Sequence, residues 1–168
     1  IALTCPASLP ATQFGGILFL GIHIAKHLSN DGHNLTIYTS DLDFANNAST
    51  FNKKLPSQEK IGNFLIKRTH VWFSTFLFYF NPGIYKQMLD DDLVIIHAIG
   101  IRSFQAFIAA LVSKRKNIPL VISDQGGLTT HQNLKESSFI KRILIEFKKP
   151  LIKFIIGQAS KIVVANDY

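Results

Sequence analysis

The sequence predicts an α/β protein with a doubly wound, mostly parallel Rossmann-like sheet. Short apolar runs alternate along the chain with longer segments of helical period, which is the pattern of repeated βαβ units. The run at residues 93–97 is continuously apolar up to its histidine, as strands covered on both faces are. The chain has 168 residues, 47% of them hydrophobic, which suffices for one domain with a buried core.

The first βαβ unit is predicted at residues 1–39. Residues 1–5 form an apolar strand, and a loop follows as far as the glycine pair. Residues 17–29 place apolar side chains at helical spacing, and Gly32 ends this helix because glycine adopts the left-handed cap conformation at little cost. Residues 34–39 form the second strand, and we expect a long polar loop at residues 40–60.

The remaining elements continue the alternation. We predict strands at residues 61–68, 93–97, 119–123 and 162–165, and helices at residues 73–89, 104–116 and 138–158. Right-handed crossovers then give the strand order 3-2-1-4-5-6, with the first and fourth strands adjacent at the centre. Ligands of such sheets bind beyond the carboxyl ends of the strands, so the loops at residues 6–16, 97–102 and 124–131 are expected to meet at one cleft.

Composition narrows the possible partners and compartment. The formal net charge is +7 and the isoelectric point is near 9.6, which favours acidic partners without choosing among them. No nucleic-acid motif is present, and no apolar run approaches a membrane span. Cys5 is the single cysteine, so no internal disulfide forms and a reducing, cytoplasmic location is expected. The absence of an initial methionine and the abrupt end at Tyr168 suggest a fragment of a longer protein.

Gly15 and Gly16 precede the first predicted helix. Backbone amides at a helix start can bind an anion, and glycine lets a phosphate approach closely. A turn that needs positive φ explains the same pair equally well. The dinucleotide fingerprint G-x-G-x-x-G is missing, although Asp41 after the second strand has the place of a ribose-binding acid.

His97 and the run from Asp124 follow apolar strands, where α/β proteins recruit site residues. Asp124, Gln125, Gly126 and Gly127 offer a charge, an amide and exposed backbone amides, which suit a sugar or a phosphate. A boundary histidine and a simple turn remain alternatives. No nucleophile motif and no set of metal ligands is apparent, since His23 and His27 lack a third partner.

The segment at residues 138–158 has an apolar face flanked by cations. The cations are Lys141, Arg142, Lys148, Lys149 and Lys153, and Pro150 is expected to kink the helix. A core-packing helix with a solvated basic face is favoured over a helix that touches anionic lipid. The aromatic stretch at residues 71–80, which contains Trp72, adds to the second interpretation.

Taken together, these stretches resemble the amino-terminal domain of family-4 glycosyltransferases with the GT-B fold. The opening strand, Pro10, Gly15-Gly16, the helix and Gly32-His33 are similar to the family's "P…GG…LA..L…GH.V.V.T". Residues 92–100 resemble "D.IH.HG", residues 118–126 resemble "iP.V…HG", and residues 135–165 resemble the closing helix and strand. The family's histidine before the second-loop glycine is replaced here by Gln125, which can hydrogen-bond but cannot titrate.

The resemblance implies metal-free, retaining transfer of a sugar from a nucleotide-sugar donor to a carbohydrate or lipid-linked acceptor. It implies that Gly15 and Gly16 close on the donor diphosphate, that Gly100, Gly126 and Gly127 shape the acceptor pocket, and that His97, Asp124 and Gln125 lie near the reacting sugar. A carboxyl-terminal donor-binding domain would be absent from this chain, and contact with the inner face of a membrane is expected. The alternatives are half of a nucleotide-dependent epimerase or dehydrogenase, and a non-catalytic membrane-surface module.

Overall fold

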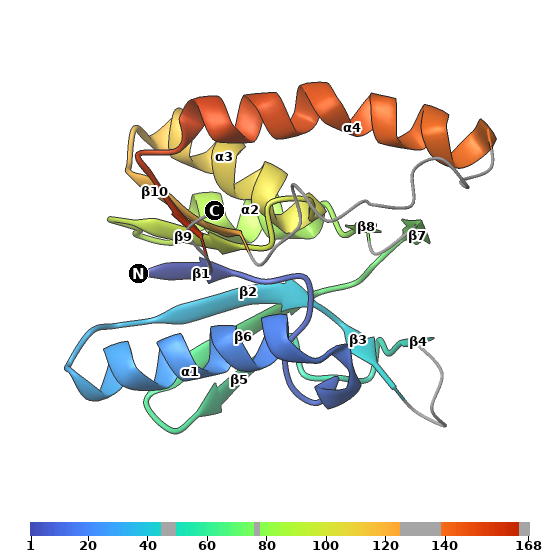
Figure 1. Ribbon diagram of the computed structural model, residues 1–168. Helices are drawn as coiled ribbons and strands as arrows, with labels where there is room; N and C mark the ends of the chain where they lie inside the picture. Colours follow the sequence, from blue (N-terminus) through green and yellow to red (C-terminus); the bar gives the residue numbers. More distant parts are fainter. Residues whose placement is uncertain (45–49, 76–77, 125–138, 165–168) are drawn as a thin grey trace.

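The computed structural model describes residues 1–44, 50–75, 78–124 and 139–164 (Figure 1). Its centre is a seven-stranded sheet in the order β11-β10-β9-β1-β2-β6-β5, in which β5 alone is antiparallel to its neighbour. The strands are β1 (Ala2–Thr4), β2 (Thr36–Ser40), β5 (Gln58–Ile61), β6 (Phe64–Thr69), β9 (Ile96–Ile99), β10 (Leu120–Asp124) and β11 (Lys161–Val164). The predicted order of six parallel strands is therefore confirmed, and β5 extends the sheet by one antiparallel edge strand.

Helices cover both faces of the sheet. α1 (Gly16–Asn30) lies on one face, and α2 (Gly83–Asp90), α3 (Phe104–Lys116) and α4 (Phe139–Gln158) lie on the other (Figure 1). The predicted first, third and fourth helices are confirmed to within a residue or so at each end, and Pro150 lies inside α4. α3 begins at Ser103, whose side chain accepts a hydrogen bond from the Ala106 backbone N–H at 3.1 Å.

Alternate residues of the strands enter two different cores. Ala2 of β1 and Ile96 and Ala98 of β9 pack under α2, α3 and α4, whereas Leu3 packs under α1. This division follows from the period of two along a strand. On the α1 side, a Cβ built on Gly21 would lie 3.6 Å from Cys5 Sγ and 3.5 Å from Ile99 Cδ1, so α1 packs closely over the centre of the sheet.

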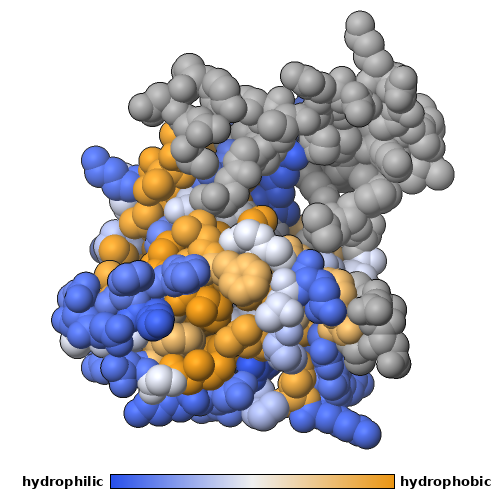
Figure 2. Space-filling view, turned by 60° about the horizontal axis from the view of Figure 1, so that its bottom comes forward, coloured by the Kyte–Doolittle hydropathy of each residue, from blue (hydrophilic) through white to orange (hydrophobic). Residues whose placement is uncertain are grey.

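The outer surface of α1 also carries apolar side chains. Figure 2 brings this face of the molecule forward and shows apolar atoms gathered in a patch beside strongly polar residues. Phe19 of α1 is among the large apolar side chains that remain exposed.

The prediction of a helix at residues 73–89 is wrong in its first half. Residues 73–80 include two short antiparallel strands, β7 (Phe73–Thr75) and β8 (Phe78–Phe80), and helix begins only at Gly83. The aromatic side chains explain the difference. The Phe80 ring stacks on the ring of its cross-strand partner Phe73, with 4.7 Å between the ring centroids, and its centroid also lies 4.7 Å from that of Phe104 in α3. Such cross-strand aromatic pairs stabilise strands.

Two other boundaries differ from the prediction. The expected polar loop at residues 40–60 contains β3 (Leu42–Asp43) and β4 (Thr50–Phe51), and β5 begins within it. The strand expected at residues 93–97 is Ile96–Ile99 instead, because Val94 precedes the sheet and is 67% exposed.

Candidate functional site

The loop after β1 is held by a buried arginine from β6. Arg68 is 3% exposed, and its Nη2 and Nε donate to the Leu9 carbonyl at 2.8 and 3.3 Å, just before the cis peptide bond to Pro10. Nη1 of Arg68 donates to the Pro56 carbonyl at 3.0 Å, and Nη2 forms an ion pair with Glu59 at 2.6 Å. The guanidinium therefore joins this loop to the segment that enters β5.

Gly15 and Gly16 form the start of α1, as predicted. Gly15 has φ of 88°, which favours glycine, and no side chain caps the helix. Among the described residues, a Cβ built on either glycine meets nothing within 4 Å, so this part of the chain leaves space open beside the start of the helix. The Gly15 N–H donates to the Thr12 carbonyl at 3.2 Å, whereas the Gly16 N–H has no partner among the described residues. The Gly16 amide and the positive end of the helix dipole make such a start suitable for an anion.

The turn after β9 meets the start of α1. Gly100 has φ of 84°, and a Cβ built on it would lie 4.0 Å from Ile17 Cδ1. The Gly100 N–H donates to the Ser123 carbonyl at 3.1 Å, which ties this turn to the end of β10. Within the described residues, the buried Nε of Arg102 in the same turn has no hydrogen-bond partner. The first helix turn, Gly100 and the end of β10 thus share one edge of the sheet.

His97 does not end its strand, contrary to the prediction. It is the second residue of β9, in register with Leu3 and Val121, so it lies about 7 Å short of the carboxyl end of the strand. His97 Nε2 is 2.8 Å from Ser123 Oγ, and burial lowers the pKa of this histidine below its ordinary value. A neutral imidazole that hydrogen-bonds to a neighbouring strand is the result.

The predicted residues after β10 are described only in part. Asp124 is the last residue of β10 and is 7% exposed, so its carboxyl group sits at the same sheet edge as Gly100. Gln125, Gly126 and Gly127 lie outside the described residues.

An aspartate–histidine pair at this edge was missed as a pair by the sequence analysis. Asp41 directly follows β2 and His70 directly follows β6, and His70 Nδ1 lies 2.6 Å from Asp41 Oδ2. The other carboxylate oxygen of Asp41 accepts the Val71 N–H at 3.0 Å. The signal available in the sequence was that a titratable residue follows each of two neighbouring strands.

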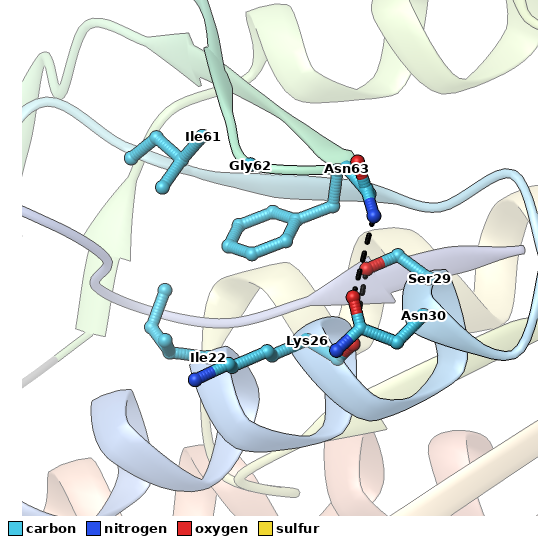
Figure 3. A pocket seen from close by; sticks show the side chains of 8 residues that line it. Ile22, Lys26, Ser29, Asn30, Ile61, Gly62 and Asn63 are labelled. Carbon is cyan, nitrogen blue, oxygen red and sulfur yellow. Dashed lines mark hydrogen bonds between the residues drawn. The ribbon is translucent and has the colours of Figure 1, made fainter.

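A shallow groove lies at the opposite end of the sheet. It runs between the carboxyl-terminal half of α1 and the β5–β6 turn, where Asn63 Nδ2 donates to Asn30 Oδ1 at 3.3 Å beside Lys26 and Ser29 (Figure 3). Phe64, which lines the groove, is the first residue of β6, so the groove borders the amino ends of the strands. None of the predicted site residues that the structure describes lines it.

Among the described residues, no group of three or more histidine, cysteine, aspartate or glutamate side chains is placed to hold a metal ion. A search of the same part of the chain finds no helix with the length and apolar character needed to cross a membrane. Comparison with models of known protein families and with curated protein sequences found no match to this chain.

Proposed function

We propose that this chain is the acceptor-side domain of a retaining glycosyltransferase with the GT-B fold, acting on a nucleotide-sugar donor. The observation that carries the proposal is the meeting of an uncapped, glycine-started helix with the turn at Gly100 and the end of β10. This edge is where α/β sheets bind ligands, and the Gly16 amide at the helix start suits a diphosphate.

The proposed roles follow the chemistry of each group. Gly15 and Gly16 border the donor diphosphate, which the Gly16 amide binds, while Gly100 and the glycines that follow Gln125 shape the acceptor pocket. Asp124 borders the reacting sugar from the end of β10, and His97 supports this edge from within β9 through its contact with Ser123. Because burial keeps His97 neutral, it acts through hydrogen bonds rather than through a positive charge.

In the proposed reaction, the bond from the anomeric carbon to the diphosphate breaks and a bond to the acceptor oxygen forms on the same face. The hydroxyl proton of the acceptor leaves with the nucleoside diphosphate, so no separate oxidant, reductant or resident metal is required. A second domain, outside this chain, would bind most of the donor, in a cytoplasmic enzyme that contacts the inner face of a membrane.

The assay should use the product of the complete gene, with UDP-glucose, UDP-galactose, UDP-N-acetylglucosamine and GDP-mannose as probes. Proton NMR of the released sugar gives both turnover and anomeric configuration, and we expect retention. The variant Gly16→Val should raise the KM for the donor about tenfold or more, because its side chain occupies the open approach to the amides. Gly157→Val in α4 is the matched control, since a Cβ there also meets none of the described residues within 4 Å.

Consumption of none of the four donors, or equal KM values for the two variants, would overturn the proposal. Tight dinucleotide binding would instead favour the epimerase or dehydrogenase alternative. The residues between β1 and α1, which run from Cys5 to Gly15, already disfavour it, because the dinucleotide fingerprint needs a tight turn there.

The membrane-surface alternative is favoured by one observation, the exposure of Trp72 and Phe73 at 71% and 55%. Aromatic side chains and nearby cations attach proteins reversibly to anionic lipid. Cosedimentation of the complete protein with anionic but not neutral vesicles, weakened by salt, is the expected result for this alternative. Equal and negligible binding to both kinds of vesicle would remove it.

A further inference from the structure

The Asp41–His70 pair has a fixed orientation. Asp41 is buried at 4% exposure, and its carboxylate is held by the Val71 N–H at 3.0 Å and by His70 Nδ1 at 2.6 Å. Its backbone is fixed as well, because the Asp41 N–H donates to the Thr69 carbonyl at 3.2 Å and its carbonyl accepts the Asn52 N–H at 2.9 Å. The imidazole of His70 therefore cannot turn freely about its attachment.

This contact also decides which nitrogen of His70 carries the proton. A carboxylate accepts hydrogen bonds, so Nδ1 is the donor toward Asp41 and Nε2 of the neutral ring is left as an acceptor. Nε2 has no hydrogen-bond partner among the described residues, and the side chain is 35% exposed. The pair thus presents a pre-oriented hydrogen-bond acceptor to solvent.

Trp72 follows His70 by two residues in the chain. Val71 points into a core with Ala7, Ala11 and Leu18, whereas the residues on either side of it are accessible to solvent. Two residues of chain span at most about 7 Å, so His70 and Trp72 lie within reach of one small ligand. The backbone N–H of Trp72 donates to the Phe80 carbonyl at 2.9 Å, and the centroids of the indole and the Phe80 ring are 6.0 Å apart. These two contacts hold the exposed indole in place.

The pair also flanks the proposed donor site. Leu18 belongs to the first turns of α1, and Ala7 and Ala11 belong to the loop after β1, so the core under Val71 is shared with the loop that leads to Gly15. The β7–β8 ribbon lies at the end of the sheet toward which β1 and β2 point (Figure 1). A ligand on His70 and Trp72 would approach the reacting sugar from the β2–β6 half of the sheet.

We infer that His70 and Trp72 form a carbohydrate-binding subsite, with the indole as a platform for the C–H face of a pyranose and His70 Nε2 as the acceptor for one of its hydroxyls. That this carbohydrate is the sugar acceptor rests on the proposed function. An aromatic face with one polar group at its margin matches the two surfaces of a pyranose. A buried carboxylate that orients a hydrogen-bond acceptor has no use toward lipid tails, and for that reason we place a sugar here rather than a membrane.

Trp72 is the single tryptophan of the chain, so its fluorescence reports ligand binding at this subsite. Its fluorescence should be followed on titration with the methyl β-glycosides of glucose, galactose and N-acetylglucosamine. We expect a saturable change with at least one probe, weakened about tenfold by His70→Gln, which is the worth of one hydrogen bond. His33 is an exposed histidine just after the carboxyl end of α1, and His33→Gln should bind the glycosides as the wild type does.

No change with any of the three glycosides would overturn the inference, as would equal binding by His70→Gln and the wild type. A blue shift with phosphatidylglycerol vesicles but none with glycosides would assign Trp72 to a membrane instead. Imidazole ¹⁵N NMR supplies a second measurement, in which a protonated Nδ1 and an unprotonated Nε2 are expected for His70. Its cross-peaks should shift when the glycoside binds.

Assays of transfer and of donor hydrolysis with the complete enzyme test this inference separately from the proposed function. Donor hydrolysis uses water as the acceptor, whereas transfer needs the acceptor subsite, so the ratio of transfer to hydrolysis should fall about tenfold in His70→Gln. Glycoside binding without any donor turnover would refute the glycosyltransferase and leave the subsite standing. Donor turnover with an unchanged ratio would refute the acceptor role of His70.

Discussion

β6 and β11 are parallel strands of one sheet that are held in different ways. Among the described residues, two ion pairs and one carboxylate–histidine hydrogen bond each take one partner from β6 or from the residue directly after it: Lys67–Asp91, Arg68–Glu59 and His70–Asp41. β11 contributes none of these pairs, and all four of its residues are exposed. Directional polar contacts fix one half of the sheet, whereas the other half ends in an apolar strand with a single neighbour.

The two edges of the sheet repeat this contrast. β5 covers β6 as a short antiparallel strand with Gln58, Glu59 and Lys60, and polar or charged edge strands resist pairing with other chains. β11 presents Ile162, Val163 and Val164 to solvent at the opposite edge. The β5 edge is therefore protected by its own sequence, and the β11 edge is not.

The largest expected effect comes from two isoleucines that are register partners on β10 and β11. Ile122 is fully buried in the core under α3, whereas Ile162 is 43% exposed. Ile122→Ala should lower the free energy of unfolding by about 3 kcal/mol, and Ile162→Ala by less than about 1 kcal/mol. Urea denaturation checks this, provided the m-value is unchanged. Equal losses would mean that β11 is as firmly packed as β10.

The buried guanidinium of β6 gives the next effect. Arg68→Met keeps the apolar stem but removes the donors to the Leu9 and Pro56 carbonyls and the partner of Glu59. We expect the free energy of unfolding to fall by about 2–3 kcal/mol, since hydrogen bonds of a charged group are lost in a buried place. Lys60→Met on the neighbouring β5 is the matched control. A loss no larger than that of the control would contradict the structural role of Arg68.

The polar cluster around Asp91 predicts a dependence on acid. Burial by itself would raise the pKa of Asp91, but hydrogen bonds from Lys67 and Tyr38 and the charges of Lys67 and Lys116 lower it below its ordinary value of 3.8. The stabilisation is complete above that ordinary value and is lost as the pH falls below it. Asp91→Asn should cost about 1 kcal/mol at neutral pH, and the difference from the wild type should shrink in acid.

The control for this cluster is Asp90→Asn at the exposed preceding residue, which should change the free energy of unfolding at neutral pH by less than Asp91→Asn does. A gap between Asp91→Asn and the wild type that stays constant on acidification would show that Asp91 does not titrate with folding.

His97, in the β9–β11 half of the sheet, provides the smallest expected effect. Burial lowers the pKa of His97 below 6.5, so the unfolded chain binds the proton more tightly than the folded one. Stability is complete above 6.5 and falls as the pH drops through that value toward the folded pKa. Thermal unfolding between about pH 5 and pH 8 should show a shallower slope for His97→Gln, with His33→Gln as control. Identical slopes for the wild type and His97→Gln would contradict the burial of a neutral ring.

The apolar strands and their order could be predicted because a parallel sheet needs continuous hydrophobic runs and right-handed connections. β5 could not, because Gln58, Glu59 and Lys60 are polar and become a strand only by pairing with β6. Residues 73–80 were misassigned because their aromatic side chains fit a helix period equally well. What selects strands there is the contact of Phe80 with Phe104 of α3, which local sequence does not show.

Those parts of the candidate site could be predicted that depend on single residues next to the end of a strand or the start of a helix. Gly15 and Gly16 lie where the sequence placed them, at the start of α1. The Asp41–His70 pair depends on two residues that are far apart in the chain and meet only because β2 and β6 are neighbours. Such a pair follows from the strand order once it is known, and not from the spacing of the residues.

Arg68 has a consequence for how the native state opens. Its guanidinium holds the loop after β1 through the Leu9 carbonyl and the segment that enters β5 through Pro56 and Glu59, so displacement of this one side chain loosens both. Native-state hydrogen exchange should therefore release the amides of the β5–β6 hairpin and those of residues 8–14 at one common opening free energy, as a single cooperative unit. A protease that cuts the edge hairpin would then also free the approach to Gly15, although the two sites belong to different ends of the molecule.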